Sequence, residues 1–296
     1  MRICSFLPSA TEILFALGLA DSIMGVTFEC DHPSEARSKP VVVYTKLTPG
    51  LPEREIDRQV KMISGAGQSL YRLDVGKLRE IQPDLIVTQD LCHVCAASPA
   101  DLSAVLAQLP MVPEVISTSP RTVPEVWNDI LRVGQATGRE SEAKRLVRRL
   151  GDRICEIQET RHEGDPPRVL CLEWLDPPFV AGHWVPEMVK LAGGIDVLGR
   201  AGEPGYEIDW SAVVMSAPDL ILPMPCGYHE REVEQELQKI RLPAAWYSLP
   251  AVRNQRVFAM DASSYFSRPG PRIVEGIAAM TEVFARVTSA VEGKAI

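Results

Sequence analysis

The chain has 296 residues, of which 46% are hydrophobic and 24% charged, a composition typical of a soluble globular protein with one large domain or two ordinary ones. Its formal net charge of −8 leaves no broad basic surface, which argues against a nucleic-acid partner. Because no apolar run reaches the ~18 residues that span a bilayer, we predict no transmembrane helix.

Strand-like and helix-like segments alternate from the N-terminus. Residues 3–7 read as a buried strand, and a turn containing Pro8 leads into an apolar helix at 13–19. This order of strand, turn and helix is typical of an α/β sheet. We also predict strands at 23–26, 41–44 and 112–116 and helices at 53–64 and 73–81.

One stretch occurs twice. Residues 83–95 begin Pro-Asp-Leu-Ile-Val, and residues 218–229 begin Pro-Asp-Leu-Ile-Leu. In each copy a Pro-Asp turn leads into a short apolar run, which predicts a strand buried on both faces of a parallel sheet. A cysteine-bearing loop follows each strand, at the edge where open α/β sheets bind ligands. The repeat therefore predicts two similar lobes, each offering a thiol-bearing loop to a shared cleft.

A long helical run separates the two copies. Apolar residues recur at helical spacing from residue 123 to 163, with Arg and Glu between them. Gly134 and Gly138 are expected to divide the run into two helices, the second about 33 Å long at ~1.5 Å per residue. We therefore predict an N-terminal α/β lobe at 1–122, linking helices at 123–163 and a C-terminal α/β lobe at 164–296.

The second half opens as the first does. Arg168-Val-Leu-Cys-Leu parallels Arg2-Ile-Cys-Ser-Phe, and a proline-containing turn follows each segment. The predicted fold class is therefore α/β, with two Rossmann-like lobes built on parallel sheets and joined by one long rigid helix. In the second lobe we predict helices at 187–191, 210–215 and 272–287 and a last strand at 256–260.

Cysteine usage bears on the compartment. The seven cysteines are odd in number and scattered rather than spaced as a disulfide framework, which favours a reducing environment. Residues 2–7 already read as the first strand, so we expect no secretory leader at the N-terminus. We expect a cytoplasmic protein, with a periplasmic one as the alternative if the true start codon lies upstream.

Four residues on the cysteine loops form a candidate metal site. Cys92 and Cys95 have C-x-x-C spacing, and Cys226 and His229 lie on the repeated loop. If the two loops face each other, these residues form a Cys3His set that could bind zinc or iron. The same pattern is compatible with a redox pair or with ordinary loop thiols, because spacing alone fixes no distances.

Aromatic residues gather near predicted strand ends of the second lobe, where their faces could hold a large flat ligand. About half of them are expected to be core residues. Glu173 and His183 are compatible with acid–base roles, but the chain has no nucleophile elbow, phosphate loop or dinucleotide motif, so we predict no enzyme activity. The aromatic candidates are Trp174, Phe179, Trp184, Tyr206, Tyr228, Tyr265 and Phe266.

Several motifs together resemble one known family. Over nearly the whole chain the sequence is similar to the iron-siderophore and cobalamin binding proteins of ABC importers, a class III periplasmic-binding-protein-like family, and most to the cobalamin-binding branch. The resemblance implies two α/β lobes joined by a rigid helix, with the ligand between them. The motifs are Pro8-Ser-Ala-Thr-Glu12, Leu78-x-x-Ile-x-Pro83-Asp-Leu-Ile, the long central helix, Pro177-Pro-Phe, Gly193-Gly and Arg268-Pro-Gly-Pro-Arg272.

The resemblance also bears on partners and contacts. Members of that family dock on their permease through a surface glutamate on each lobe, and here Gly76 and Ser211 stand at those positions, which argues against docking on an ABC permease. Ser264 replaces an acidic residue that the family has four positions before the arginine at 268. The resemblance points to four cleft contacts, Gln89, Phe179, Tyr206 and Arg268.

Three functions are compatible with this sequence. The first is a non-catalytic, monomeric protein that binds a corrinoid such as cobalamin, or a related tetrapyrrole or metal chelate, in the interlobe cleft. The second is an exported substrate-binding subunit of an ABC importer, and the third is a metal-dependent or redox enzyme that uses Cys92, Cys95 and Cys226. For the first, the predicted ligand-binding residues are Gln89, Trp174, Phe179, Trp184, Tyr206, Tyr228, Phe266 and Arg268.

Overall fold

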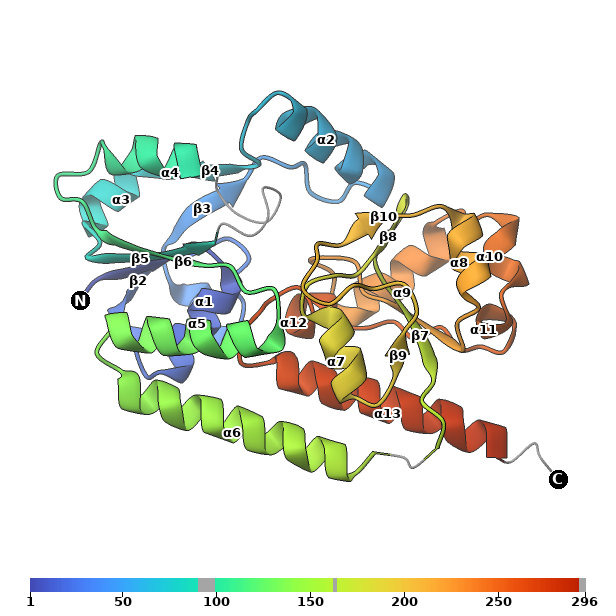
Figure 1. Ribbon diagram of the computed structural model, residues 1–296. Helices are drawn as coiled ribbons and strands as arrows, with labels where there is room; N and C mark the ends of the chain where they lie inside the picture. The colour runs from blue at the N-terminus through green and yellow to red at the C-terminus, as the bar shows by residue number, and fades with distance from the viewer. Residues whose placement is uncertain (90–98, 162–163, 293–296) are drawn as a thin grey trace. The chain divides into compact units, whose positions relative to one another are not determined.

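A computed structural model describes residues 1–89, 99–161 and 164–292 of the chain (Figure 1). The chain forms two compact units, and helix α6 (Glu140–Glu159) begins in the first and ends in the second. Each unit combines a sheet with helices, which confirms the predicted α/β class with two lobes. Unit 1 contains residues 1–120 and 124–148, and unit 2 contains residues 121–123 and 149–296.

Unit 1 is built on a six-stranded sheet with the strand order β4-β3-β2-β1-β5-β6. The strands are parallel except at one edge, where β4 is antiparallel to β3. The sequence prediction missed β4 and placed Leu73 in a helix, because three residues are too few to show a period of two. The strands are β1 (Ile3–Ser5), β2 (Ile23–Thr27), β3 (Val41–Thr45), β4 (Tyr71–Leu73), β5 (Leu85–Gln89) and β6 (Glu114–Thr118).

The predicted break in the central helical run is confirmed, because α5 ends at Ala136 and α6 begins at Glu140. Gly138, between them, has a φ of +66°, a backbone conformation that favours glycine. Gly134 allows the two helices to approach, since a Cβ at this position would collide with the side chain of Ala143. The helices that precede α6 are α1 (Pro8–Ala16), α2 (Glu53–Gly65), α3 (Val75–Ile81), α4 (Pro99–Leu106) and α5 (Val123–Ala136), with 3₁₀ turns at Ala20–Ser22 and Ser34–Ser38.

Unit 2 has a smaller sheet with the strand order β10-β8-β7-β11, and β9 pairs with β7. β7 and β11 are parallel, but β8 is antiparallel to both β7 and β10. The sheet is therefore mixed rather than parallel throughout, because residues 176 and 177 form a two-residue turn and so short a connection joins only antiparallel strands. The strands are β7 (Arg168–Leu175), β8 (Pro178–Val180), β9 (Ile195–Asp196), β10 (Tyr206–Glu207) and β11 (Leu220–Pro223).

The duplicated Pro-Asp stretch makes the same contacts in both units. In unit 1 the Arg2 backbone N–H donates to Asp84 Oδ2 (2.6 Å), and the Asp84 N–H donates to the Arg2 carbonyl (2.8 Å). In unit 2 the Arg168 N–H donates to Asp219 Oδ2 (2.8 Å), and the Asp219 N–H donates to the Arg168 carbonyl (2.8 Å). Each reciprocal pair holds the start of the repeated strand against the start of the first strand of its unit, β5 against β1 and β11 against β7.

The strand predicted at 256–260 is reduced to a single bridge between Val257 and Ile221. The segment still lies along β11, because the Phe258 N–H donates to the Ile221 carbonyl (3.0 Å) and the Met260 N–H donates to the Pro223 carbonyl (3.0 Å). The prediction was right about the position of this segment and wrong about its regularity.

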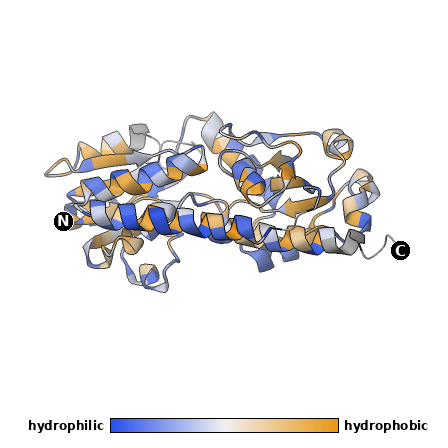
Figure 2. Ribbon diagram, turned by 60° about the horizontal axis from the view of Figure 1, so that its bottom comes forward, coloured by the Kyte–Doolittle hydropathy of each residue, from blue (hydrophilic) through white to orange (hydrophobic). Residues whose placement is uncertain are grey.

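Helices complete unit 2. Among all helices in the described part of the chain, none is both long and apolar enough to cross a membrane. Leu170, Leu172, Val180 and Ile221 are completely buried in its core. Figure 2 shows strands that are mainly hydrophobic and helices with hydrophilic and hydrophobic bands, as expected for half-buried helices. The helices are α7 (Val185–Leu191), α8 (Trp210–Ser216), α9 (Glu230–Lys239), α10 (Ala244–Ser248), α11 (Pro250–Arg253), α12 (Ala262–Tyr265) and α13 (Ile273–Glu292).

Asp196, on β9, is a buried carboxyl group with a perturbed pKa. Its Oδ1 accepts hydrogen bonds from the backbone N–H groups of Leu198 (3.1 Å) and Gly199 (2.6 Å), whereas Oδ2 is buried with no hydrogen-bond partner in the described chain. Burial raises the pKa of this carboxyl group to about 6, and the two backbone donors oppose the rise only in part. The folded protein therefore holds a proton at Asp196 more tightly than the unfolded chain does.

We predict that Asp196→Asn removes a pH-dependent part of the stability. The stabilisation from protonated Asp196 is complete below the unfolded pKa and is lost as pH rises through about 6, a total on the order of 2–3 kcal/mol. The variant keeps an oxygen for the two N–H groups but does not ionise. In urea unfolding, raising the pH from 5 to 7.5 should therefore cost the variant less stability than the wild type, and equal losses would contradict this assignment.

Candidate functional site

Three of the predicted ligand-binding aromatics lie together on one face of unit 2. Trp174 on β7 is the cross-strand partner of Phe179 on β8, and directly paired residues of antiparallel strands project to the same side of a sheet. The Trp174 ring also packs edge-to-face on Tyr228, with the ring centroids 6.1 Å apart and the planes at 82°. All three side chains are half-buried, so part of this aromatic face is accessible to a ligand.

Tyr206 projects to the opposite side of the sheet. It pairs with Val180 on β8, the neighbour of Phe179, and neighbouring residues of a strand face opposite ways. Its hydroxyl donates to the Leu198 carbonyl (2.8 Å), and Arg200 lies over its ring with Cζ 4.7 Å from the ring centroid. Within unit 2, Tyr206 therefore packs against the core rather than joining the aromatic face.

Trp184 and Phe266 are interior residues of unit 2, with exposed fractions of 6% and 3%. The Trp184 Nε1–H donates to the Phe266 carbonyl oxygen (2.9 Å), which attaches the segment after α12 to the start of α7. Their burial favours a supporting role: they hold the backbone that leads to Arg268.

The loop that follows β11 is attached on both sides. The Met224 and Cys226 N–H groups donate to the carbonyls of Leu172 (2.8 Å) and Glu173 (3.1 Å), which continues the pairing with β7 beyond the end of β11. The Ser263 N–H, at α12, donates to the Tyr228 carbonyl (2.9 Å). These bonds fix the position of Tyr228 and hence one side of the aromatic face.

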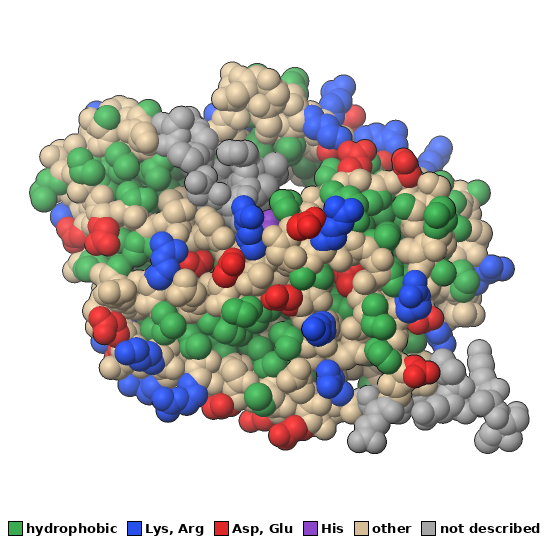
Figure 3. All heavy atoms as spheres, in the orientation of Figure 1, with side chains coloured by type: hydrophobic (Ala, Val, Ile, Leu, Met, Phe, Trp, Pro, Cys, Tyr) green, Lys and Arg blue, Asp and Glu red, His purple; other side chains and the backbone are tan. Residues whose placement is uncertain are grey.

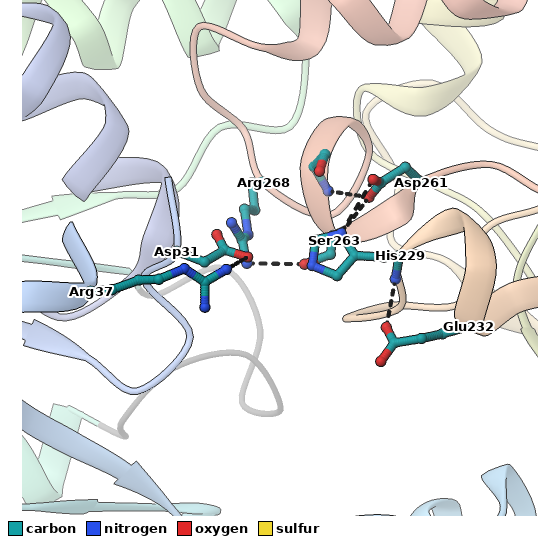
Figure 4. A network of polar contacts seen from close by, with 8 residues as sticks. Asp31, Arg37, His229, Glu232, Asp261, Ser263 and Arg268 are labelled. Atoms are coloured by element: carbon teal, nitrogen blue, oxygen red, sulfur yellow. Dashed lines mark hydrogen bonds and ion pairs between the residues drawn. The ribbon is translucent and has the colours of Figure 1, made fainter. Parts of the chain in front are cut away.

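A polar network extends from this loop to Arg268 (Figure 4). His229 Nδ1 lies 3.1 and 3.2 Å from the two carboxylate oxygens of Asp261, whose Oδ1 also accepts from the Ser264 N–H (2.8 Å). Arg268 is 8% exposed, and its Nη2 donates to Ser263 Oγ (3.0 Å). Ser264, which stands where the resembling family has an acid, acts here through its backbone.

Sequence reasoning missed Asp261 and Ser263 as parts of this network. Asp is a preferred helix N-cap residue, and the Asp261 side chain caps α12 by accepting a hydrogen bond from the Ser264 backbone N–H. The four-residue length of α12 hid this signal, because so short a helix has no recognisable hydrophobic period.

The structure describes two of the four predicted metal ligands, Cys226 and His229. Cys92 and Cys95 lie outside the described residues. Cys226 is exposed and free of a disulfide, and His229 is oriented by Asp261, an arrangement that also orients metal-binding imidazoles. In the described chain, no group of three or more His, Cys, Asp or Glu side chains is placed to hold a metal ion. The zinc or iron site therefore stays a prediction.

His183 has an uncommon backbone conformation, with a φ of +54°. Its N–H donates to the Glu203 carbonyl (2.6 Å), and its own carbonyl accepts from the Gly202 N–H (2.9 Å), which holds the residue in place. Burial, and then the nearby Arg121 guanidinium, lower the pKa of the imidazole, so it is neutral at pH 7. Its buried Nε2 has no hydrogen-bond partner among the residues that the structure describes, and Glu173 packs against Gly205, where a Cβ would collide with it.

In unit 1, Gln89 is the last residue of β5 and pairs in register with Thr118, the last residue of β6. It is 8% exposed and lies at the carboxyl edge of the parallel strands, where α/β sheets bind ligands.

The surface drawn in Figure 3 intersperses acidic and basic side chains with hydrophobic ones.

Comparison with known proteins decides the family. Residues 3–264 match the family described as periplasmic binding protein. The chain belongs to the periplasmic binding protein family. This confirms the resemblance inferred from the motifs.

Relatives of known name span nearly the whole chain. The vitamin B12-binding protein of Vibrio cholerae is 22% identical over 280 residues, covering 93% of this chain and 86% of its own, and the uncharacterized ABC transporter substrate-binding lipoprotein YvrC of Bacillus subtilis is 25% identical over 289 residues, covering 95% and 79%. Among solved structures, the periplasmic heme-binding protein RhuT of Roseiflexus sp. RS-1 matches with a TM-score of 0.71 at 25% identity, covering 97% of this chain and 98% of that one. The periplasmic vitamin B12 binding protein BtuF of Vibrio cholerae matches with a TM-score of 0.70 at 20% identity, covering 97% of each chain.

These relatives revise two expectations drawn from the sequence. They include an ABC transporter substrate-binding protein, so the argument against a permease from Gly76 and Ser211 is not supported. The two solved structures are named as periplasmic proteins and the Bacillus subtilis relative as a lipoprotein, which favours the periplasmic alternative over the cytoplasmic expectation. All are named as binding proteins, which agrees with the prediction of a non-enzyme.

We predict that Trp184→Phe destabilises this periplasmic binding protein by about 1–3 kcal/mol, because it leaves the buried Phe266 carbonyl without its donor. Trp174→Phe is the matched control, since the Trp174 Nε1 is buried and has no hydrogen-bond partner in the described chain. Urea unfolding at pH 7.5 measures both, and a loss in Trp174→Phe as large as that in Trp184→Phe would contradict the supporting role of Trp184.

Proposed function

We propose that this protein is the substrate-binding protein of an ABC importer and that its substrate is a corrinoid or a closely related metal tetrapyrrole. It binds and delivers this ligand without chemical change. The observation that carries the proposal is the face formed by Trp174, Phe179 and Tyr228, in a chain related over 280 residues to a vitamin B12-binding protein.

The chemistry of the aromatic face supports a large, flat ligand. Aromatic rings bury much apolar area and order few rotatable bonds when they bind, so a half-exposed group of three favours contact with a broad conjugated surface. Phe179 and Trp174 are held by strand pairing, and Tyr228 by the bonds of its loop, so the face is formed before the ligand arrives. Such preorganisation lowers the entropy that binding costs.

Polar groups near the face suit the rim of the ligand. Arg268, fixed by Ser263, supplies a buried guanidinium that recognises an acceptor oxygen, and such oxygens occur on the amide side chains of corrinoids and the carboxylates of haems. The choice between the two ligands thus depends on peripheral groups rather than on the macrocycle. The B12-binding relatives favour the corrinoid.

The proposal places the protein outside the cytoplasmic membrane, with an ABC permease as its partner. The names of the relatives as periplasmic proteins or as a lipoprotein support this location. Because Gly76 and Ser211 lack the carboxylates that the sequence comparison led us to expect, docking would depend on other surface residues.

We predict that the purified protein binds cyanocobalamin tightly enough for coloured ligand to remain with it through gel filtration. Titrations with cyanocobalamin, haemin and a ferric chelate should rank cyanocobalamin first. Phe179→Ala should weaken binding about 10-fold or more, because it removes a buried aromatic contact. Tyr247→Ala removes a side chain that is 58% exposed on α10 and is the control, with no change expected.

Two results would contradict the proposal. One is the absence of binding to any of the three ligands at about 0.1 mM, which corresponds to less than ~5.5 kcal/mol of binding free energy. The other is equal weakening by Phe179→Ala and Tyr247→Ala, which would indicate that the aromatic face is not the binding surface.

A further inference from the structure

The carboxylate of Asp261 joins two segments of unit 2 that are 32 residues apart in sequence (Figure 4). On one side its Oδ1 accepts a hydrogen bond from the Ser264 N–H (2.8 Å), which caps the start of α12. On the other side its two oxygens lie 3.1 and 3.2 Å from His229 Nδ1. An ionised carboxylate can only accept, so the His229 Nδ1–H is the donor in this contact. One side chain thus holds both the loop after β11 and the short helix α12.

Each of these two segments carries a group of the proposed ligand site. Tyr228, directly before His229, belongs to the aromatic face, and its carbonyl accepts from the Ser263 N–H (2.9 Å). Ser263 is 4% exposed and lies in α12, two residues after Asp261. Its Oγ accepts from Arg268 Nη2 (3.0 Å), the guanidinium proposed to recognise the rim of the ligand. A shift of α12 would therefore move the anchors of Tyr228 and Arg268 together.

The helix α12 depends on Asp261 because it is too short to hold its own position. It has four residues, fewer than an isolated helix needs to form. Its far end is attached separately, since the Phe266 carbonyl accepts from the Trp184 Nε1–H (2.9 Å). Its start is fixed by the cap and by the contact of the same carboxylate with His229.

His229 is itself anchored, because it is the N-cap of α9. Its N–H donates to Glu232 Oε2 (2.8 Å), and the Glu232 N–H donates to the His229 carbonyl (2.8 Å). The Asp261 side chain is 21% exposed, so water screens its contact with the imidazole less than it screens a pair on the open surface. The contact therefore joins two anchored elements, the start of α9 and the start of α12.

We propose that Asp261 is a positioning residue of the ligand site. It binds no part of the ligand itself. Through His229 and the cap of α12 it fixes Tyr228 and Arg268 relative to each other, so that the aromatic and the polar contact are in place together. This inference rests on the function proposed above and deepens it, because it names the residue on which the joint position of two ligand contacts depends. Groups that are held in place before the ligand arrives lose less entropy when it binds.

The test measures cyanocobalamin binding by Asp261→Asn and by Glu230→Gln at pH 7.5. The asparagine keeps an oxygen for the Ser264 N–H but loses the charge and the second acceptor that face His229, so binding should weaken about 10-fold. Glu230→Gln removes the same charge from an exposed side chain next to His229 and is the matched control, with no change expected.

A double-mutant cycle separates positioning from a general loss of fold. Arg268→Lys removes the planar fork of N–H donors that recognises the rim of the ligand. If Asp261 positions that fork, Arg268→Lys should cost the Asp261→Asn protein clearly less affinity than it costs the wild type. Additive losses, or wild-type affinity in Asp261→Asn, would overturn the inference and leave the proposed function standing.

Hydrogen exchange tests the same link in the ligand-free protein. In Asp261→Asn the backbone amides of both segments, 224–229 and 261–268, should exchange faster than in Glu230→Gln. Faster exchange in only one segment overturns the inference that Asp261 couples the two. A wild type that binds neither cyanocobalamin nor haemin overturns both the proposed function and the role of Asp261 in binding.

Discussion

The reciprocal hydrogen bonds between an arginine backbone and the aspartate of the Pro-Asp repeat set the geometry of both units. Arg2 with Asp84, and Arg168 with Asp219, start two parallel strands in a fixed register. A register fixed at the amino ends also fixes which residues emerge at the carboxyl ends, because a slip of one residue would reverse every side chain. The position of Gln89 in one unit and of the Met224–Tyr228 loop in the other follows from this constraint.

In unit 2, a hairpin and a loop add to this register the placement of the aromatic residues. The two-residue turn after Leu175 folds β8 back on β7 and places Phe179 beside Trp174, and the bonds that extend the pairing of β11 with β7 bring Tyr228 to the same face. A hairpin thus pairs two aromatics that are close in sequence, and the loop after β11 adds a distant one. Two further contacts hold the neighbouring segments: Trp184 donates to the Phe266 carbonyl, and Asp261 holds the loop after β11 through His229.

The family relationship explains the strands and helices of this protein better than it explains individual side chains. The match spans residues 3–264, so both sheets and the helices α5 and α6 lie in the part of the chain that matches the periplasmic binding protein family. The cysteines at 92, 95 and 226, the serine at 264 and the missing carboxylates at 76 and 211 are features that the resemblance did not imply. A shared scaffold with altered contact residues is the usual way in which one binding fold serves different ligands.

The sequence by itself determined the elements whose signal is local. The Pro-Asp-Leu-Ile stretches predicted β5 and β11, and the glycines at 134 and 138 predicted the break between α5 and α6, because buried strands and helix ends leave a signature within a few residues. Only the tertiary structure decided which aromatics share a face. Tyr206 and Phe179 look alike as candidates, yet cross-strand pairing sends them to opposite sides of the sheet. Trp184 is buried, and its Nε1–H donates to a carbonyl 82 residues away. Such pairings join distant segments, and no local pattern encodes them.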